Sequence, residues 1–279
     1  MQLWESIKDL FRMTNVENSF YFVTSAAVTN VGLRREDNED NYYYHGKYLP
    51  KIHNEERGVK LWDFDTGNTQ TLAVFDGMGG ESAGDLASYI SARSFCEFVK
   101  RWEETLEMPT PSEMSDMLNK ISRFVYEKGR KNHYRLIGST ASILFLCNHE
   151  AVIADLGDSP VYLFRDNRLN RISVAHTEES LLRQQGIQRK PGLTQFLGIN
   201  SDEMCLEPYV HRMEIREGDR FLICSDGLTD MVSDAEIQDI LSRSLSVGEK
   251  IQYLLHHTLE NGGKDNVTIL LCEISEELH

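Results

Sequence analysis

The order of the apolar runs is the feature that most constrains how this chain can fold. Groups of short strand-like runs are separated by a pair of helical patterns in the middle of the chain and by another pair near its end. This order differs from the strict strand–helix alternation of a parallel sheet, and it favours an α+β fold of antiparallel sheets with helices on their outer faces. The runs predicted to be strands are 20–28, 41–44, 71–75, 138–147, 151–156, 160–164, 219–224 and 266–274.

The predicted helices have clear starting signals. Residues 82–100 and 110–130 carry apolar side chains at helical spacing, and two shorter helices follow near the end of the chain. Three starts carry a capping box, in which a hydroxyl residue and a glutamate three positions later satisfy free backbone amides. These pairs are Thr110 with Glu113, Ser233 with Glu236, and Ser246 with Glu249.

Three segments lack such clear patterns. Residues 2–12 are predicted to form a short amphipathic helix, either a docking segment or an edge helix packed on the core. Residues 46–70 are polar and contain several turn formers, so we expect a long hairpin excursion. Residues 165–218 are predicted to be irregular, because proline and glycine interrupt every period.

Charge and hydropathy narrow the range of partners. The chain has 29 Lys and Arg against 44 Asp and Glu, which gives a formal net charge of −15. Such a surface repels nucleic acids and anionic lipids. No run approaches the ~20 apolar residues of a membrane span, and no signal peptide is recognisable. We therefore expect no nucleic-acid partner, no membrane insertion and a cytoplasmic location.

Acidic residues stand next to the most apolar runs. Asp76 follows LAVF, Asp226 comes after FLICS, Asp265 precedes VTILL by two residues, and Glu39 with Asp40 precedes a tyrosine-rich strand. A single aspartate at a strand end is usually a turn former. Several carboxylates at one edge of a core repel each other unless a cation separates them. Oxygen ligands without His or Cys select hard ions, so the pattern predicts an Mg²⁺ or Mn²⁺ site.

Glycines and an arginine complete this candidate site. Asp76 is the natural bridge between two ions because its carboxylate has two oxygens, and the carbonyl of Gly77 is a further possible ligand. Two ions ~3.5–4 Å apart would activate a water molecule near neutral pH. Arg35 is the candidate for binding an anionic substrate, although its spacing fits a solvated loop arginine equally well.

At these residues the chain resembles the metal-dependent Ser/Thr protein phosphatases, the PPM or type 2C family, in its bacterial form. Seven short blocks follow the family's order between about residues 24 and 274, and together they make the resemblance specific. The blocks are GLRREDNED (32–40), VFDGMGG (74–80), GSTA (138–141), LGDS (156–159), LTQFLG (193–198), CSDGL (224–228) and DNVT (265–268).

The resemblance implies a fold and a reaction. The fold would be a central sandwich of two antiparallel β-sheets flanked by α-helices, in the order α-β-β-α. Residues 20–279 would form a single metal-dependent phosphatase domain after an N-terminal extension at 1–19. The activity would be hydrolysis of phosphoserine and phosphothreonine in proteins by water activated at a binuclear Mg²⁺ or Mn²⁺ centre. A cognate Ser/Thr kinase, or the substrates of that kinase, would be partners.

The resemblance also implies a role for each site residue. Asp76 would bridge two metal ions, with Asp226 and Asp265 ligating one and the Gly77 carbonyl contributing to the other. Glu39 and Asp40 would hold metal ions through water, and Arg35 would bind the substrate phosphate. These residues form the catalytic and metal-binding set.

The chain departs from the family pattern at several positions. Met78 and Glu81 stand where members often have a histidine, so protonation of the leaving group would fall to a metal-bound water or to Glu81. Residues 131–137 contain no acid, although many members have an aspartate there that helps to bind a third ion. A third ion is therefore not expected.

Two other functions compete with this interpretation. The segment GESAG at 80–84 matches a nucleophile elbow with Ser82 as the nucleophile of a serine hydrolase, but four residues separate the motif from its strand. A phosphatase fold that serves only as a binding module is the other alternative. Metal-dependent turnover of p-nitrophenyl phosphate would distinguish an enzyme from such a module.

Overall fold

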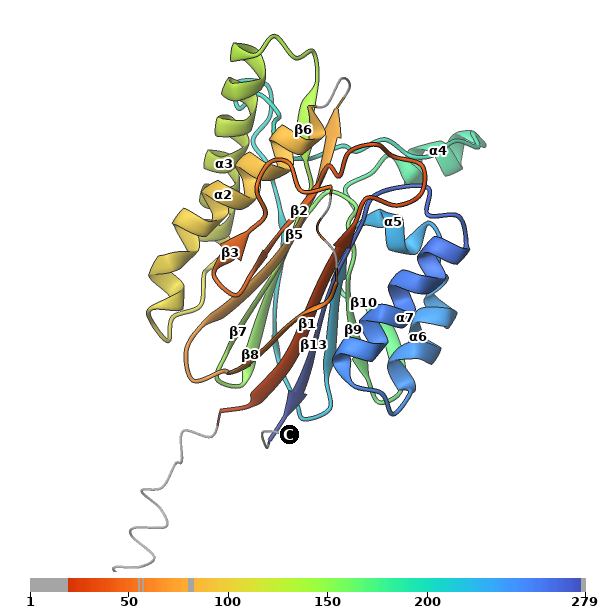
Figure 1. Ribbon diagram of the computed structural model, residues 1–279. Helices are drawn as coiled ribbons and strands as arrows, with labels where there is room; N and C mark the ends of the chain where they lie inside the picture. Colours follow the sequence, from red (N-terminus) through yellow and green to blue (C-terminus); the bar gives the residue numbers. More distant parts are fainter. Residues whose placement is uncertain (1–19, 55, 57, 80–82, 277–279) are drawn as a thin grey trace, which may run out of the picture.

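Two antiparallel sheets pack face to face and carry helices on both outer sides (Figure 1). The computed structural model describes residues 20–54, 56, 58–79 and 83–276. The predicted α-β-β-α sandwich is confirmed. The extension predicted for residues 1–19, with its helix at 2–12, lies outside the described residues.

The first sheet joins the two ends of the described chain. β1 and β13 pair along their whole length, from Phe22 opposite Ser275 to Asn30 opposite Val267. The sheet has the order β10-β9-β12-β13-β1-β4. Its strands are β1 (Phe22–Asn30), β4 (Lys60–Asp65), β9 (Val161–Arg165), β10 (Arg168–Arg171), β12 (Arg220–Cys224) and β13 (Val267–Ser275).

The second sheet is built around β5, which pairs with strands on both sides. Its order is β11-β8-β7-β5-β2-β3, and the short β6 pairs with the end of β5. Its strands are β2 (Asp40–Tyr44), β3 (Lys47–Tyr48), β5 (Gln70–Gly79), β6 (Ile137–Ser139), β7 (Ala141–Cys147), β8 (Glu150–Leu156) and β11 (Tyr209–Glu214). The predicted strand at 71–75 is thus the buried start of a longer strand.

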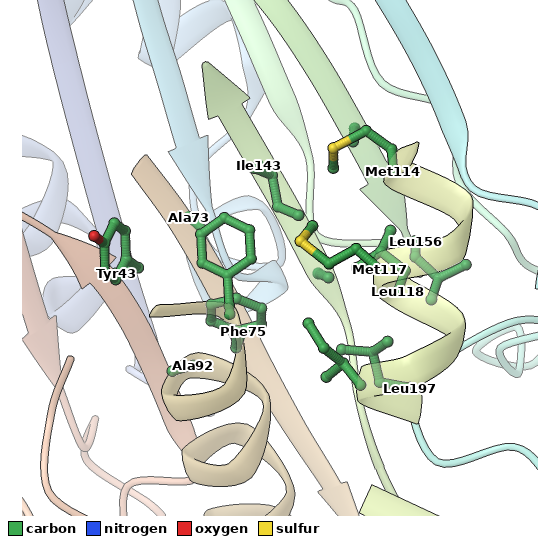
Figure 2. Close-up of a cluster of buried hydrophobic side chains, with 14 of the residues drawn as sticks. Tyr43, Ala73, Phe75, Ala92, Met114, Met117, Leu118, Ile143, Leu156 and Leu197 are labelled. Carbon is green, nitrogen blue, oxygen red and sulfur yellow. The ribbon is translucent and has the colours of Figure 1, made fainter. Parts of the chain in front are cut away.

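Alternation along β5 fills two separate cores. Leu72 and Val74 point between the sheets, whereas Ala73 and Phe75 face the helices. Figure 2 shows Phe75 among side chains from α2 (Gly84–Glu103) and α3 (Pro111–Lys131), including Met117. These residues are fully or almost fully buried, so the methionine-containing stripe of α3 is core packing.

The opposite face of the sandwich is covered by α6 (Asp234–Ser242) and α7 (Val247–Glu260). All three predicted capping boxes form, at the starts of α3, α6 and α7. Among the helices of the described part, none combines the length and apolar character that a bilayer crossing requires.

Two of the sequence predictions were incomplete. The excursion at 46–70 contains β3 and β4, and β4 forms an edge of the first sheet. The region at 165–218 contains β10, α4 (Glu179–Gln185) and β11 in addition to loops. β10 and β11 are also edge strands, and most side chains in these edge strands are exposed or half-buried. Their apolar pattern is correspondingly weak.

The capping box of α3 provides a stability test. Thr110 accepts a hydrogen bond from the Glu113 amide, and the Glu113 carboxylate accepts one from the Thr110 amide at 2.9 Å. We expect Thr110→Ala to lower the free energy of unfolding by about 1 kcal/mol. Thr110→Ser keeps the hydroxyl and should lose much less. Urea unfolding of both variants checks this, and equal losses would contradict a capping role.

Candidate metal centre

Strand pairing places two of the predicted carboxylates directly opposite each other. Asp40 is the first residue of β2, and its cross-strand partner on β5 is Asp76. Asp40 is 1% exposed, so its carboxylate lies inside the fold. Two acids at adjacent positions in a sheet repel each other when both are charged, so a cation would favour this arrangement.

The first sheet brings two further aspartates to the same edge. β12 and β13 pair with Cys224 opposite Ile269, so Asp226 after β12 and Asp265 before β13 lie at one end of the sheet. The Ser225 hydroxyl donates a 2.7 Å hydrogen bond to Asp40. This bond links the two sheets, and it connects the Asp226 segment to the Asp40–Asp76 pair.

Close backbone packing explains two of the glycines. A side chain on Gly77 would overlap the carbonyl oxygens of Glu39 and Gly84, and the Gly77 amide donates to the Glu39 carbonyl at 3.1 Å. A side chain on Gly227 would overlap the Asn266 carbonyl. Glycine therefore allows the last part of β5 and the segment after β12 to pack closely against the neighbouring backbone.

Asn266 holds the loop that carries Arg35 and Glu39. Its side-chain amide donates to the carbonyls of Val31 and Asp37, each at 2.9 Å, and its oxygen accepts from the Glu39 amide at 2.8 Å. Arg35 in this loop bonds Asp265 at 2.8 Å. The structure thus brings Arg35 to the edge where the aspartates lie.

Glu39 is held at the start of α2. One of its carboxylate oxygens accepts a hydrogen bond from the Gly84 amide at 3.2 Å. Burial raises the pKa of Glu39, whereas Arg35 acts to lower it. Glu39 directly precedes β2, which begins at Asp40.

The electrostatics of the cluster reflect burial and mutual repulsion. Burial raises the pKa of Asp40 to about 7 despite hydrogen bonds from Ser225 and Thr268. Burial raises the pKa of Asp76 well above its ordinary value, and the charges of Asp40, Asp226 and other aspartates add to this. Burial and the neighbouring aspartates thus both act to raise the pKa values of Asp40 and Asp76.

Lys190 supplies a positive charge from a distant part of the chain. Its ammonium group bonds Asp226 at 2.8 Å and Asp230 at 2.9 Å. Burial acts to lower the pKa of Lys190, but the two aspartates raise it overall. Lys190 and Arg35 therefore each neutralise one of the predicted ligands, Asp226 and Asp265.

The residues present suit a hard divalent cation in their chemistry. They offer carboxylate and carbonyl oxygens, which are the preferred ligands of Mg²⁺ and Mn²⁺. In the part of the chain that the structure describes, however, the His, Cys, Asp and Glu side chains do not form a group of three or more that could hold a metal ion. Lys190 and Arg35 form ion pairs with Asp226 and Asp265, which are two of the predicted ligands. A metal ion would have to displace these side chains or bind beside them.

Sequence reasoning missed several residues of this edge. Lys190 was not singled out, and Ser225 and Asn266 appeared only within the CSDGL and DNVT blocks without a role, because each acts through a partner far away in the sequence. Asp158 lies within the LGDS block, and its pKa is raised to about 6 by burial and by Asp226. The motif itself could have pointed to Asp158 as a member of the cluster. Glu81 and Ser82 lie outside the described residues.

The raised pKa of Asp40 predicts an unusual pH dependence. An unfolded aspartate titrates near 3.8, whereas folded Asp40 does so near 7. Between these values the folded state holds an extra proton, so the metal-free protein should lose stability as pH rises from 5 to 8. Asp40→Asn should reduce this loss by at least about 1 kcal/mol, since one pKa unit corresponds to about 1.4 kcal/mol.

Urea unfolding with chelator at several pH values measures this effect. Asp63→Asn is the matched control, because Asp63 is an exposed residue of β4. It should follow the wild type at every pH. An Asp40→Asn profile that coincides with the wild-type profile would contradict the raised pKa.

Known proteins resemble this chain in both sequence and fold. The family model described as protein phosphatase 2C matches residues 59–261. The Serine/threonine phosphatase stp of Listeria welshimeri is 32% identical over 79% of this chain and 90% of its own. PppA of Pseudomonas aeruginosa has a similar structure, with a TM-score of 0.73 and 27% identity over 90% of this chain and 97% of its own.

A further solved structure bears on metal binding. The catalytic domain of the phosphatase PstP, in complex with two manganese ions, matches with a TM-score of 0.70 and 25% identity. The match covers 91% of this chain and 99% of that one. Together with the carboxylates gathered at the edge of the sandwich, these likenesses show that the chain belongs to the protein phosphatase 2C family.

Proposed function

We propose that this chain hydrolyses phosphoserine and phosphothreonine in proteins, using a pair of Mg²⁺ or Mn²⁺ ions. The observation that carries the proposal is the position of Asp40 opposite Asp76, with Asp226 and Asp265 at the same edge. A phosphate monoester is an anion, and a chain with a net charge of −15 can bind it only where cations collect. The names of the relatives support the choice of substrate.

The predicted ligands have separate roles in this proposal. Asp76 would hold both ions, and the Gly77 carbonyl would contribute to one of them. Asp226 and Asp265 would hold the other ion, and Glu39 and Asp40 would act through water. When bound, the ions supply Lewis-acid activation of water for attack on phosphorus. We propose no third ion, because residues 131–137 contain no acid.

The surrounding residues position these groups. Ser225 fixes one oxygen of Asp40, and Asn266 holds the loop that carries Arg35. The Arg35 side chain is 48% exposed, so substrate can reach it. Its guanidinium can leave Asp265 and bind two phosphate oxygens in parallel. Arg35 thus exchanges one anionic partner for another when substrate enters.

Each alternative makes a different prediction. A binding module without activity would hold phosphoproteins but would not release phosphate. A serine hydrolase would depend on Ser82 and would survive chelation, and Ser82 lies outside the described residues. We propose a cytoplasmic location for the phosphatase, and phosphoproteins made by a Ser/Thr kinase as its substrates.

Removing the metal or its bridging ligand tests the proposal. We expect chelation to abolish phosphate release from a phosphothreonine peptide, and Mn²⁺ to restore it. Asp76→Asn should lower kcat/KM by at least 100-fold, on the order of 3 kcal/mol of transition-state stabilisation. Circular dichroism should show an intact fold. Asp63→Asn should keep wild-type activity, and full activity of Asp76→Asn would contradict the assigned bridge.

The role of Arg35 can be tested against its neighbour. Arg34 is also exposed, and it precedes Arg35 in the same loop. We expect Arg35→Ala to lower kcat/KM by about 10- to 100-fold, as befits the loss of a charge-assisted bidentate contact. Arg34→Ala should change it by less than about threefold, the scale of an exposed charge. Equal effects in the two variants would show that general charge, rather than Arg35, attracts the phosphate.

A further inference from the structure

The C-terminal part of α3 and the segment after it form a basic region on an acidic protein. Residues 120–135 contain six Lys and Arg residues and one acid, although the whole chain has a net charge of −15. The basic residues are Lys120, Arg123, Lys128, Arg130, Lys131 and Arg135. Most of the protein surface is acidic and repels an acidic polypeptide, whereas the basic region at residues 120–135 attracts it.

Two of these arginines line a hollow of about 450 Å³. Arg130 and Arg135 are both exposed, and neither lies within ion-pair distance of a described carboxylate. Arg130 has a long 3.5 Å contact with the Tyr126 hydroxyl. The hollow's acid, Glu203, accepts a hydrogen bond from Asn200 at 3.1 Å. The two guanidinium groups therefore remain available to an anion.

The walls of the hollow suit a peptide. Tyr134 and Phe196 are half-buried and contribute aromatic surface, and Leu136 is 49% exposed beside them. Apolar and aromatic surface beside a few charged groups is typical of ligand-binding pockets, in which the charged groups provide specificity. The arginines would read a carboxylate, since their planar donor geometry matches it.

The hollow is connected to the candidate metal centre through strand pairing. Its lining residue Ile137 belongs to β6 and lies opposite Gly79 on β5. Gly79 is three residues beyond Asp76, which corresponds to about 10 Å along a strand. An extended peptide advances by a similar distance over three residues. A substrate with its phosphate at the centre can thus place a side chain about three residues away in the hollow.

We propose that this hollow is a specificity site for an acidic side chain about three residues from the phosphorylated residue of the substrate. Arg130 and Arg135 bind the carboxylate, and the aromatic walls hold the intervening peptide backbone. The proposal rests on the phosphatase function proposed above. It assigns substrate preference to residues that lie outside the set predicted to bind metal and phosphate.

Matched phosphopeptides test the proposal. One has glutamate three residues before the phosphothreonine, another has glutamate three residues after it, and their partners have glutamine at the same positions. The Mn²⁺-loaded wild type should turn over one glutamate peptide about 3- to 10-fold more efficiently than its glutamine partner, the scale of one or two exposed ion pairs. This preference should shrink at high salt.

Two double variants locate the preference. Arg130→Gln with Arg135→Gln should remove the preference and leave turnover of the glutamine peptides and of p-nitrophenyl phosphate unchanged. Lys120→Gln with Arg123→Gln removes the same charge from α3 and should keep the preference. A wild type that does not distinguish glutamate from glutamine would overturn the proposal. Equal loss in both double variants, or a preference that survives in the first, would overturn it too.

A binding measurement separates this proposal from the proposed function. Fluorescence anisotropy with non-hydrolysable phosphonate versions of the peptides gives the same comparison without turnover. If no substrate is hydrolysed, including p-nitrophenyl phosphate, the proposed activity fails. The ratio of glutamate to glutamine affinities then still decides whether the hollow recognises an acidic side chain.

Discussion

Carboxylates gathered at one end of the sandwich repel each other, and the rest of the fold must offset the cost of this repulsion. Asp40 is buried opposite Asp76, and Asp226 and Asp265 come from the other sheet to the same edge. Gathering these groups opposes folding unless protons or cations neutralise them. Extensive apolar layers on both sides of each sheet supply stabilisation that can offset this cost. The core can therefore tolerate a cluster that is unfavourable by itself.

The geometry of this edge depends on residues that carry no charge. Ser225 joins the sheets through its bond to Asp40, and Asn266 holds the loop before β2 by three hydrogen bonds. Gly77 and Gly227 permit backbone contacts that any side chain would block. Such close contacts define where the carboxylates lie, because tightly packed backbone leaves little freedom to the turns that carry them. We expect a change in any of these residues to displace several of the proposed ligands together.

What the sequence could predict depended on how local the signal was. The strand at 71–75, the capping box at Thr110 and the aspartates at strand ends all follow from neighbouring residues, and the structure contains each of them. The edge strands β4, β10 and β11 were missed because their exposed faces weaken the apolar period. Lys190 was missed because its contact with Asp226 spans 36 positions, and no local pattern reports it. The missed features thus depend on contacts between distant parts of the chain, which a local sequence pattern does not show.

Positively charged side chains are concentrated at a few places in this acidic fold. A chain with so many acids can attract an anionic substrate only where cations are concentrated, and these cations come from separate segments of the chain. Lys190 lies between α4 and β11, Arg35 lies between β1 and β2, and the basic end of α3 leads into β6. Because β6 pairs with β5 beyond Asp76, this last group is connected to the cluster by the sheet itself. The strand that carries Asp76, the proposed bridging ligand, would therefore also set which side chain of a bound peptide reaches the proposed specificity site.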